Sequence, residues 1–510
     1  MPAKAWLTSP GAKNLVQSVA VVPVVALVGF AVVYLISPII SDCIEPQVAA
    51  VAYRAALHHG RIYGPLQDGP QYSLLYGPAT YLVHMPLFLL FGGSLFTAKL
   101  VGVAALLVSL WSVYRSCRTL ASASESIMAL GLVCLVLASF GFMAFWNRPE
   151  PILLLCVAVP VWMIASNRQW ASFVAVGAAL ALALHLKVTG GLYLVPVIAF
   201  MRPLRNIGKT IAALSLAAAL LAAPFLLQSV SLPDYLGTLR VAAAHGLDRQ
   251  LFLENIQLAA LLLLPICWCV LLRRRVARLS LRTIVNLAAL VLPIAAVCVI
   301  GAKPGAGSHH LIPFVGILPY AFLWLRADDV SVVSARGSIV PILIPVAFTL
   351  LALGMTTMGV VLMSFPAQFR EGKALVREVN SIVHDYPNRS IEMGYGESVY
   401  ETATYFRCLL VFAGNPYTLD AIAVQELQFG GKSLPVATRR LLEQCHTEMW
   451  LIPKGEQPFA AHNGYNMEVP VFDSAFRRAF VDHYHHIESR QFFEVWGCTT
   501  EGKVARTISD

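Results

Sequence analysis

The 510-residue sequence predicts an all-α polytopic membrane domain, residues 1–363, followed by a smaller soluble α/β domain, residues 364–510. Hydrophobic residues make up 57% of the chain and charged residues only 13%, whereas ordinary soluble proteins have about 25% charged residues. The first region carries 23 Lys and Arg against 10 Asp and Glu, and the second carries 14 against 18. A basic excess confined to the apolar region is typical of membrane loops and argues against a nucleic-acid surface.

Apolar runs predict about 11 transmembrane helices, because a helix needs roughly 20 residues to cross the hydrocarbon core. The predicted crossings are residues 15–38, 97–114, 126–144, 152–166, 171–186, 189–201, 210–227, 256–272, 283–300, 311–325 and 339–363. The two runs around Lys187 could instead form one broken or re-entrant element. An odd number of crossings, with Lys and Arg concentrated on one side, predicts a cytoplasmic N-terminus and an outer C-terminal domain.

The long first outer loop, residues 39–96, contains one more apolar stretch, residues 81–95. This stretch is short and contains His84 and Pro86, so it is predicted to be an in-plane helix rather than a crossing. In the tail, residue periodicity predicts helices at 367–385, 435–445 and 473–483 and strands at 390–393, 449–452 and 491–496.

The ten cysteines show no CxxC pair and no zinc-ligand spacing. Six fall in or beside apolar runs and are predicted to be small core residues. The other four, among which a disulfide could form, are Cys43, Cys408, Cys445 and Cys498.

Ionisable groups at a membrane boundary are costly unless they are paired or functional, and the predicted outer edge gathers them in four places. Asp42 and Glu45 follow the first apolar run and precede an amphipathic segment with Arg54; Ser41 or Asp42 could also serve simply as a helix N-cap. Arg148 and Glu150 occupy a very short loop between two apolar runs, where a plain salt bridge at a helix end is the alternative.

The other two places are richer in basic groups. Lys187, followed by Gly190 and Gly191, suits a phosphate site, although a snorkelling lysine would look the same. Lys303, His309 and His310 lie in a glycine-rich segment; adjacent histidines lack zinc-site spacing on a helix face, so we expect hydrogen bonds to a sugar or phosphate. Together the four places predict a site at the bilayer surface that acts on a lipid-linked substrate. A transporter would more often place such groups near the midplane in both halves of the chain.

These residues resemble motifs of the GT-C superfamily of integral-membrane glycosyltransferases, which includes protein O-mannosyltransferases and lipid A aminoarabinose transferases. The resemblance covers about residues 15–325. It rests on Asp42 with Glu45, Gly60-Arg61-Ile62-Tyr63, Leu75-Tyr76-Gly77-Pro78, Arg148-Pro149-Glu150, the run Leu186 to Gly190, and His310-Leu311-Ile312-Pro313. Glu150 stands where many relatives have Asp, and Cys43-Ile44 separates two acids that are usually adjacent. The motifs therefore indicate the superfamily and not a particular acceptor.

The resemblance implies that a sugar passes from a polyprenyl phosphate to an acceptor hydroxyl, with inversion, on the periplasmic face of a bacterial inner membrane. Asp42 would be the general base, and Glu150 would orient the acceptor or share that role. Phosphate binding would fall to Arg148, Lys187, Lys303, His309 and His310, with Glu45 and Arg54 as further substrate-binding residues.

No cofactor is certain from the resemblance, and a divalent metal ion held by Asp42 and Glu150 is one option. The implied partners are the polyprenyl-phosphate-linked sugar donor, a lipid or cell-envelope glycan acceptor and the bilayer, without nucleic acid. In the tail, aromatic side chains could stack on sugars or simply pack in its core. These are Tyr395, Tyr400, Tyr405, Tyr417 and Trp450.

Two other functions are compatible with the sequence. A polysaccharide polymerase or ligase using a diphosphate-linked glycan would need a larger donor groove and more outer arginines. A non-enzymatic transporter or scaffold should keep full function when Asp42 is changed to Asn.

Overall fold

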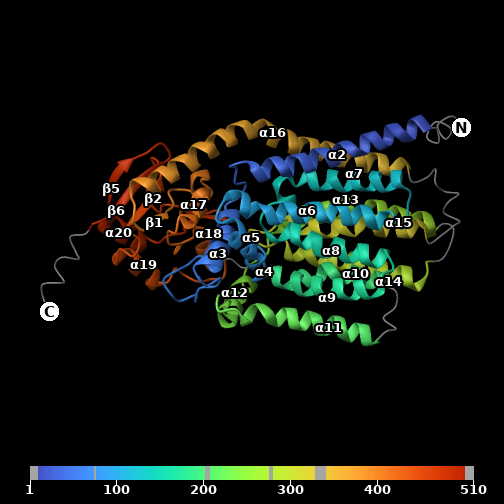
Figure 1. Cartoon of the computed structure of the whole chain (residues 1–510), viewed down its shortest axis with the longest axis horizontal. Coiled ribbons are helices and arrows are strands. Elements are labelled where there is room, and N and C mark those ends of the chain that lie inside the picture. Colours follow the sequence, from blue (N-terminus) through green and yellow to red (C-terminus); the bar gives the residue numbers. More distant parts are fainter. Residues whose placement is uncertain (1–9, 74–75, 202–206, 275–278, 328–339, 500–510) are drawn as a thin grey trace. The chain divides into compact units, whose positions relative to one another are not determined.

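The structure is a computed structural model that describes residues 10–73, 76–201, 207–274, 279–327 and 340–499 (Figure 1). It divides into two compact units, each assembled from separate stretches of sequence. Unit 1 consists of Met1–Ile36, Lys99–Ala223 and Leu247–Pro366, and unit 2 of Ser37–Ala98, Pro224–Gly246 and Ala367–Asp510.

Unit 1 is helical, and each of the eleven predicted apolar runs contains a helix. The α-helices are α2 (Pro10–Ile36), α6 (Leu95–Cys117), α7 (Ala123–Ser139), α8 (Pro149–Ala165), α9 (Gln169–Leu186), α10 (Leu194–Phe200), α11 (Ile207–Ala222), α13 (Arg249–Arg274), α14 (Leu281–Ile300), α15 (Leu318–Ala327) and the first part of α16 (Val340–Asp385). Helix α2 packs on α7, α8 packs on α9, and α9 packs on α11 (Figure 1). Short 3₁₀ helices, η1 (Gly141–Ala144), η2 (Gly190–Tyr193), η3 (Ala223–Leu226) and η4 (Ser308–Gly316), interrupt or extend the α-helices.

Among the described residues, six helices are long and apolar enough to cross a membrane. They are Ser18–Ile36, Leu95–Cys117, Gln169–Leu186, Ile207–Leu226, Arg249–Leu271 and Leu281–Ile300. The pair η4 and α15, bent by 46°, would make a seventh. The polytopic all-α fold is thus confirmed, whereas the number of 11 crossings stays a prediction. Residue 339, the start of the last predicted run, lies outside the described residues.

Unit 2 contains a four-stranded sheet in the order β1-β2-β6-β5, formed by β1 (Ile391–Met393), β2 (Met449–Pro453), β6 (Phe493–Cys498) and β5 (Tyr484–Ser489). Strand β1 is parallel to β2, and the other two pairs are antiparallel. A separate hairpin joins β3 (His462–Asn463) to β4 (Asn466–Pro470). The three predicted strands and three predicted helices of the tail are present, which confirms the α/β class. The helices of the tail are the end of α16, α17 (Arg407–Phe412), α18 (Ala421–Phe429), α19 (Val436–Glu443), α20 (Ser474–His483) and the 3₁₀ helix η6 (Thr402–Phe406).

The predicted first outer loop folds with this tail. It forms α3 (Glu45–Leu57), α4 (Ala79–Leu82) and α5 (Met85–Phe91), and unit 2 also includes α12 (Leu232–Ala243). The Gln71 amide donates to the Thr418 carbonyl over 2.7 Å, and the Asp420 amide donates to the Gln71 carbonyl over 2.8 Å. Helix α16 continues unbroken through the position of the predicted boundary between residues 363 and 364.

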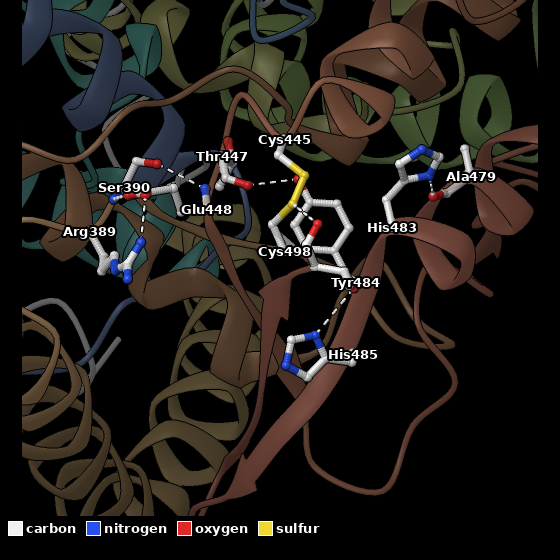
Figure 2. The surroundings of a disulfide bond; sticks show 11 residues. Arg389, Ser390, Cys445, Thr447, Glu448, Ala479, His483, Tyr484, His485 and Cys498 are labelled. Carbon is white, nitrogen blue, oxygen red and sulfur yellow. Dashed lines mark hydrogen bonds and ion pairs between the residues drawn. A yellow bond between two sulfur atoms is a disulfide. The ribbon is translucent and has the colours of Figure 1, made fainter. Parts of the chain in front are cut away.

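One disulfide joins Cys445, just after α19, to Cys498 at the end of β6, with the two Cα atoms 5.9 Å apart. Figure 2 shows the ring of Tyr484 beside this bond, and the Tyr484 hydroxyl donates to the Thr447 carbonyl over 2.6 Å. The sequence left a disulfide possible among the four cysteines outside the apolar runs, and this bond joins two of them.

Candidate active site

A buried group of charged and aromatic side chains surrounds Glu150 in unit 1. The Glu150 side chain is fully buried, and its Oε1 lies 2.5 Å from the ammonium nitrogen of Lys187. Its Oε2 accepts a hydrogen bond of 3.0 Å from the indole nitrogen of Trp146. Nε2 of His309 lies 3.8 Å from Glu150 Oε1, and Nε2 of His310 lies 3.3 Å from Lys187 Nζ. The structure thus brings Glu150, Lys187, His309 and His310 together as one cluster, here named the Glu150 cluster.

Local sequence places each member at a helix end. Arg148 is extended at the N-cap of α8, and the proline at the start of that helix suits its first turn, where an amide donor is not needed. Lys187 is the extended C-cap residue of α9. The chain then folds back closely, since a side chain at Gly190 would collide with the Ala183 carbonyl oxygen. At Gly102 a side chain would likewise collide with the Trp146 carbonyl, so the glycine lets α6 approach the turn before Glu150.

Basic side chains surround the Glu150 carboxylate. Two cationic side chains, Lys187 and Arg148, and two histidines act on a single carboxylate. The Arg148 guanidinium lies 4.0 Å from the centroid of the Trp146 ring and is buried. Among the described residues, buried Nε2 of His309 and Nδ1 of His310 have no hydrogen-bond partner. These two ring nitrogens give the buried cluster spare hydrogen-bonding capacity that a polar ligand can use.

The same group could hold a metal ion. One ligand atom each from Glu150, His309 and His310 lie within 4.8 Å of one another. Adjacent histidines lack zinc-site spacing on an α-helix face, but here they lie on the 3₁₀ helix η4, and the third possible ligand comes from α8. The Lys187 ammonium contacts both Glu150 and His310, so it would compete with a bound cation. The alternative metal pair of Asp42 and Glu150 draws on both units and stays a prediction.

One more candidate residue of unit 1, Lys303, and one motif residue, Leu75, lie apart from the Glu150 cluster in the sequence. Lys303 is half-buried in the turn before η4. Leu75, part of the motif that precedes α4, lies outside the described residues.

In unit 2, Asp42 lies in a tight turn before α3. Its Oδ1 accepts a hydrogen bond of 2.6 Å from the Ile44 amide, and Glu45 Oε2 accepts bonds from the Ser41 amide and hydroxyl over 2.8 and 2.7 Å. The helix N-cap is Ile44, without a side-chain bond, so the N-cap alternative for Ser41 or Asp42 is wrong. Arg54 donates to the Tyr417 carbonyl over 2.6 Å.

Unit 2 contains a buried ion pair, Arg407 with Asp420, that the sequence patterns did not predict. Nε of Arg407 lies 2.8 Å from Asp420 Oδ2, and both side chains are almost completely buried. Burial by itself lowers the pKa of Arg407, but Asp420, Tyr395 and Tyr417 together raise this pKa well above its usual value. A single arginine at the head of the apolar run Arg407–Phe412 is the only sequence signal for this pair.

Of the five aromatic residues proposed for sugar stacking, Tyr395, Tyr417 and Trp450 are buried, which favours core packing for these three. Tyr400 is 42% exposed and Tyr405 is half-buried. Only these two remain accessible to an acceptor.

The fold and the buried cluster define a polytopic membrane protein with a charged site at helix ends. A family model described as dolichyl-phosphate-mannose-protein mannosyltransferase matches residues 77–228. The crystal structure of ArnT from Cupriavidus metallidurans bound to undecaprenyl phosphate matches with a TM-score of 0.56 and 14% identity, covering 97% of this chain and 99% of that chain. The apo form of the same protein matches with a TM-score of 0.52 and 14% identity, covering 97% and 98%.

No curated protein sequence matches the chain. The structural matches show that the chain has the fold of ArnT, a GT-C glycosyltransferase, which confirms the resemblance at the level of the fold. They extend through the tail, which the sequence motifs did not cover.

Proposed function

We propose that this protein is a membrane glycosyltransferase that moves a sugar from a polyprenyl-phosphate donor to an acceptor hydroxyl, with inversion. The observation that carries the proposal is the buried Glu150 cluster, in which Lys187 and two histidines gather around one carboxylate, within the fold of ArnT. The ArnT structure contains undecaprenyl phosphate, a ligand of the class proposed here.

In this proposal the Glu150 cluster acts on the leaving group. As the bond between the anomeric carbon and the phosphate oxygen breaks, negative charge grows on the phosphate. Lys187, Arg148 and the histidines stabilise that charge. Glu150 holds the Lys187 ammonium in place over 2.5 Å and limits the cost of burying it.

Asp42 acts on the acceptor. Its carboxylate takes the proton of the acceptor hydroxyl as the oxygen attacks the anomeric carbon from the face opposite the phosphate. The new glycosidic bond forms, the lipid phosphate leaves with the electron pair, and the configuration at the anomeric carbon inverts. Tyr405 lies near Asp42 and Tyr400 is partly exposed, so these rings are the proposed stacking surface for a glycan or lipid-linked sugar acceptor.

The Cys445–Cys498 disulfide supports placing residues 364–510 as a periplasmic α/β domain, because disulfides persist in oxidising compartments. We therefore propose a multi-pass protein of a bacterial inner membrane, with its N-terminus in the cytoplasm. This orientation agrees with the basic excess of the connecting segments.

The test compares the wild-type protein with the Asp42→Asn variant, both purified in detergent, using labelled polyprenyl-phosphate sugars and a membrane extract as acceptor. We expect transfer to fall by about 10²–10⁴-fold in the variant, the typical contribution of a general base. The fold should persist, because an Asn oxygen can still accept the Ile44 amide. Asp68→Asn, at an exposed position of the same unit, is the matched control and should transfer normally.

Equal transfer by Asp42→Asn and wild type would refute the base assignment. Transfer only from diphosphate-linked glycans would favour the polymerase or ligase, and full biological function of Asp42→Asn without any transfer would favour a transporter or scaffold.

A further inference from the structure

The turn that carries Asp42 is held by a side chain from a distant part of the sequence. Within unit 2, Nη2 of Arg407 donates to the Cys43 carbonyl oxygen. The Ile44 amide donates to Asp42 Oδ1 over 2.6 Å. The Cys43 carbonyl and the Ile44 N–H belong to one peptide group, which is planar and stiff. Arg407 therefore binds one side of this group and Asp42 binds the other.

Arg407 is itself held firmly. Its Nε lies 2.8 Å from Asp420 Oδ2, and its Nη1 donates to the Thr404 carbonyl over 2.9 Å. Asp420 in turn accepts the Tyr417 hydroxyl and, at Oδ1, the Ile422 amide over 2.9 Å. Because the guanidinium is a rigid fork, fixing Nε and Nη1 also fixes the direction of Nη2. The Cys43 carbonyl thus meets a charged donor that is already oriented.

Two effects follow for Asp42. A charged donor on the carbonyl polarises the amide and strengthens its N–H as a donor to the carboxylate. The planar peptide group also transmits the orientation of Arg407 to the Asp42 carboxylate. We propose that Arg407 is a positioning residue that acts through the Cys43–Ile44 peptide group to fix the turn presenting Asp42. This inference rests on the proposed function, in which Asp42 is the base, and gives the C-terminal segment a direct part in shaping the site.

An Arg407→Lys variant separates this role from simple charge pairing. Lysine keeps a positive charge opposite Asp420, but its single nitrogen cannot bind Asp420, the Thr404 carbonyl and the Cys43 carbonyl together. Two buried cysteines outside the disulfide report on the result. Cys43 lies in the turn, and Cys408 follows Arg407 in α17.

The experiment measures maleimide labelling of Cys43 and Cys408 by peptide mass spectrometry, together with transfer kinetics. In Arg407→Lys we expect Cys43 to label at least about tenfold faster, because local opening exposes the turn, while Cys408 stays protected. We expect kcat to fall by about 10–100-fold, the size of a small misplacement of a catalytic group, with the donor KM unchanged. On the Asp42→Asn background the same change should cost little more, since the two residues act as one unit.

The matched control is Arg389→Lys, the same change in an exposed ion pair with Glu448 in unit 2, which should alter neither labelling nor transfer. Unchanged Cys43 labelling in Arg407→Lys would overturn the proposal, whatever happens to transfer. Faster labelling of both cysteines would also overturn it, because it would show that unit 2 opens as a whole. If the wild type transfers no sugar, the proposed function fails, yet the Cys43 rates still decide whether Arg407 anchors the turn.

Discussion

Two buried charged groups among the described residues differ in composition. In unit 2, Arg407 faces Asp420 one to one, and the pair is bonded further by Tyr417, the Thr404 carbonyl and the Ile422 amide. In unit 1, one carboxylate faces two cationic side chains and two histidines. A complete network of bonds rigidifies structure, and burying a charge is costly unless an opposite charge or hydrogen bonds offset that cost. We propose that the unit 2 pair holds structure in place and that the Glu150 cluster binds the donor phosphate.

The largest effect is expected when the charges of the Glu150 cluster are removed. Glu150→Gln and Lys187→Gln should each destabilise unit 1 by about 3–5 kcal/mol, because each removes one member of the buried ion pair that joins these residues over 2.5 Å. The double variant should regain most of that stability, since both charges are gone, but it should not regain transfer. Thermal unfolding in detergent and the transfer assay measure the two effects.

Glu254→Gln, an exposed acid on α13 of the same unit, is the control and should behave as wild type. A double variant that transfers normally would show that the Glu150 cluster is structural and would remove the distinction between the two groups.

A smaller effect is expected from removing the Cys445–Cys498 disulfide of unit 2. Replacing both Cys445 and Cys498 by Ser should lower the free energy of unfolding by about 2–4 kcal/mol, because the bond closes a separation of 53 residues. Differential labelling of buried cysteines during unfolding should place this loss in unit 2. Cys267→Ser, at an exposed cysteine of α13, should have no effect. A loss that appears first in the cysteines of unit 1 would contradict the expectation.

The smallest effect concerns the cation of the Glu150 cluster. Removing the ammonium in Lys187→Met leaves Glu150, His309 and His310 as three possible metal ligands. Zn²⁺ at ten times its Kd should then raise the free energy of unfolding of this variant by about 1.4 kcal/mol, and Mg²⁺, which prefers oxygen ligands, should not. Adding His309→Ala should abolish the shift. An equal Zn²⁺ shift in the wild type would show that Lys187 does not compete with a metal.

The sequence by itself predicted the class of fold and most local elements. Hydrophobic runs and periodicities are local properties, so every predicted apolar run contains a helix and the strands at 391–393, 449–453 and 493–498 were foreseen. The grouping of the first outer loop with the tail could not be predicted, because it depends on pairing such as Gln71 with Thr418. The number of 11 crossings stays a prediction, since several apolar helices of the described residues are short.

For the site, the sequence predicted that Glu150, Lys187, His309 and His310 lie in separate loops on one side of the membrane and contribute to one site. Only the tertiary structure decided that they form one cluster, because Lys187 and His310 are 123 residues apart and the 3₁₀ geometry of η4 sets the histidine positions. The contact of Arg407 with Cys43 spans 364 residues and is invisible to any local pattern. Residue type and spacing determine which groups are costly to bury, and packing of distant segments determines which partner offsets that cost.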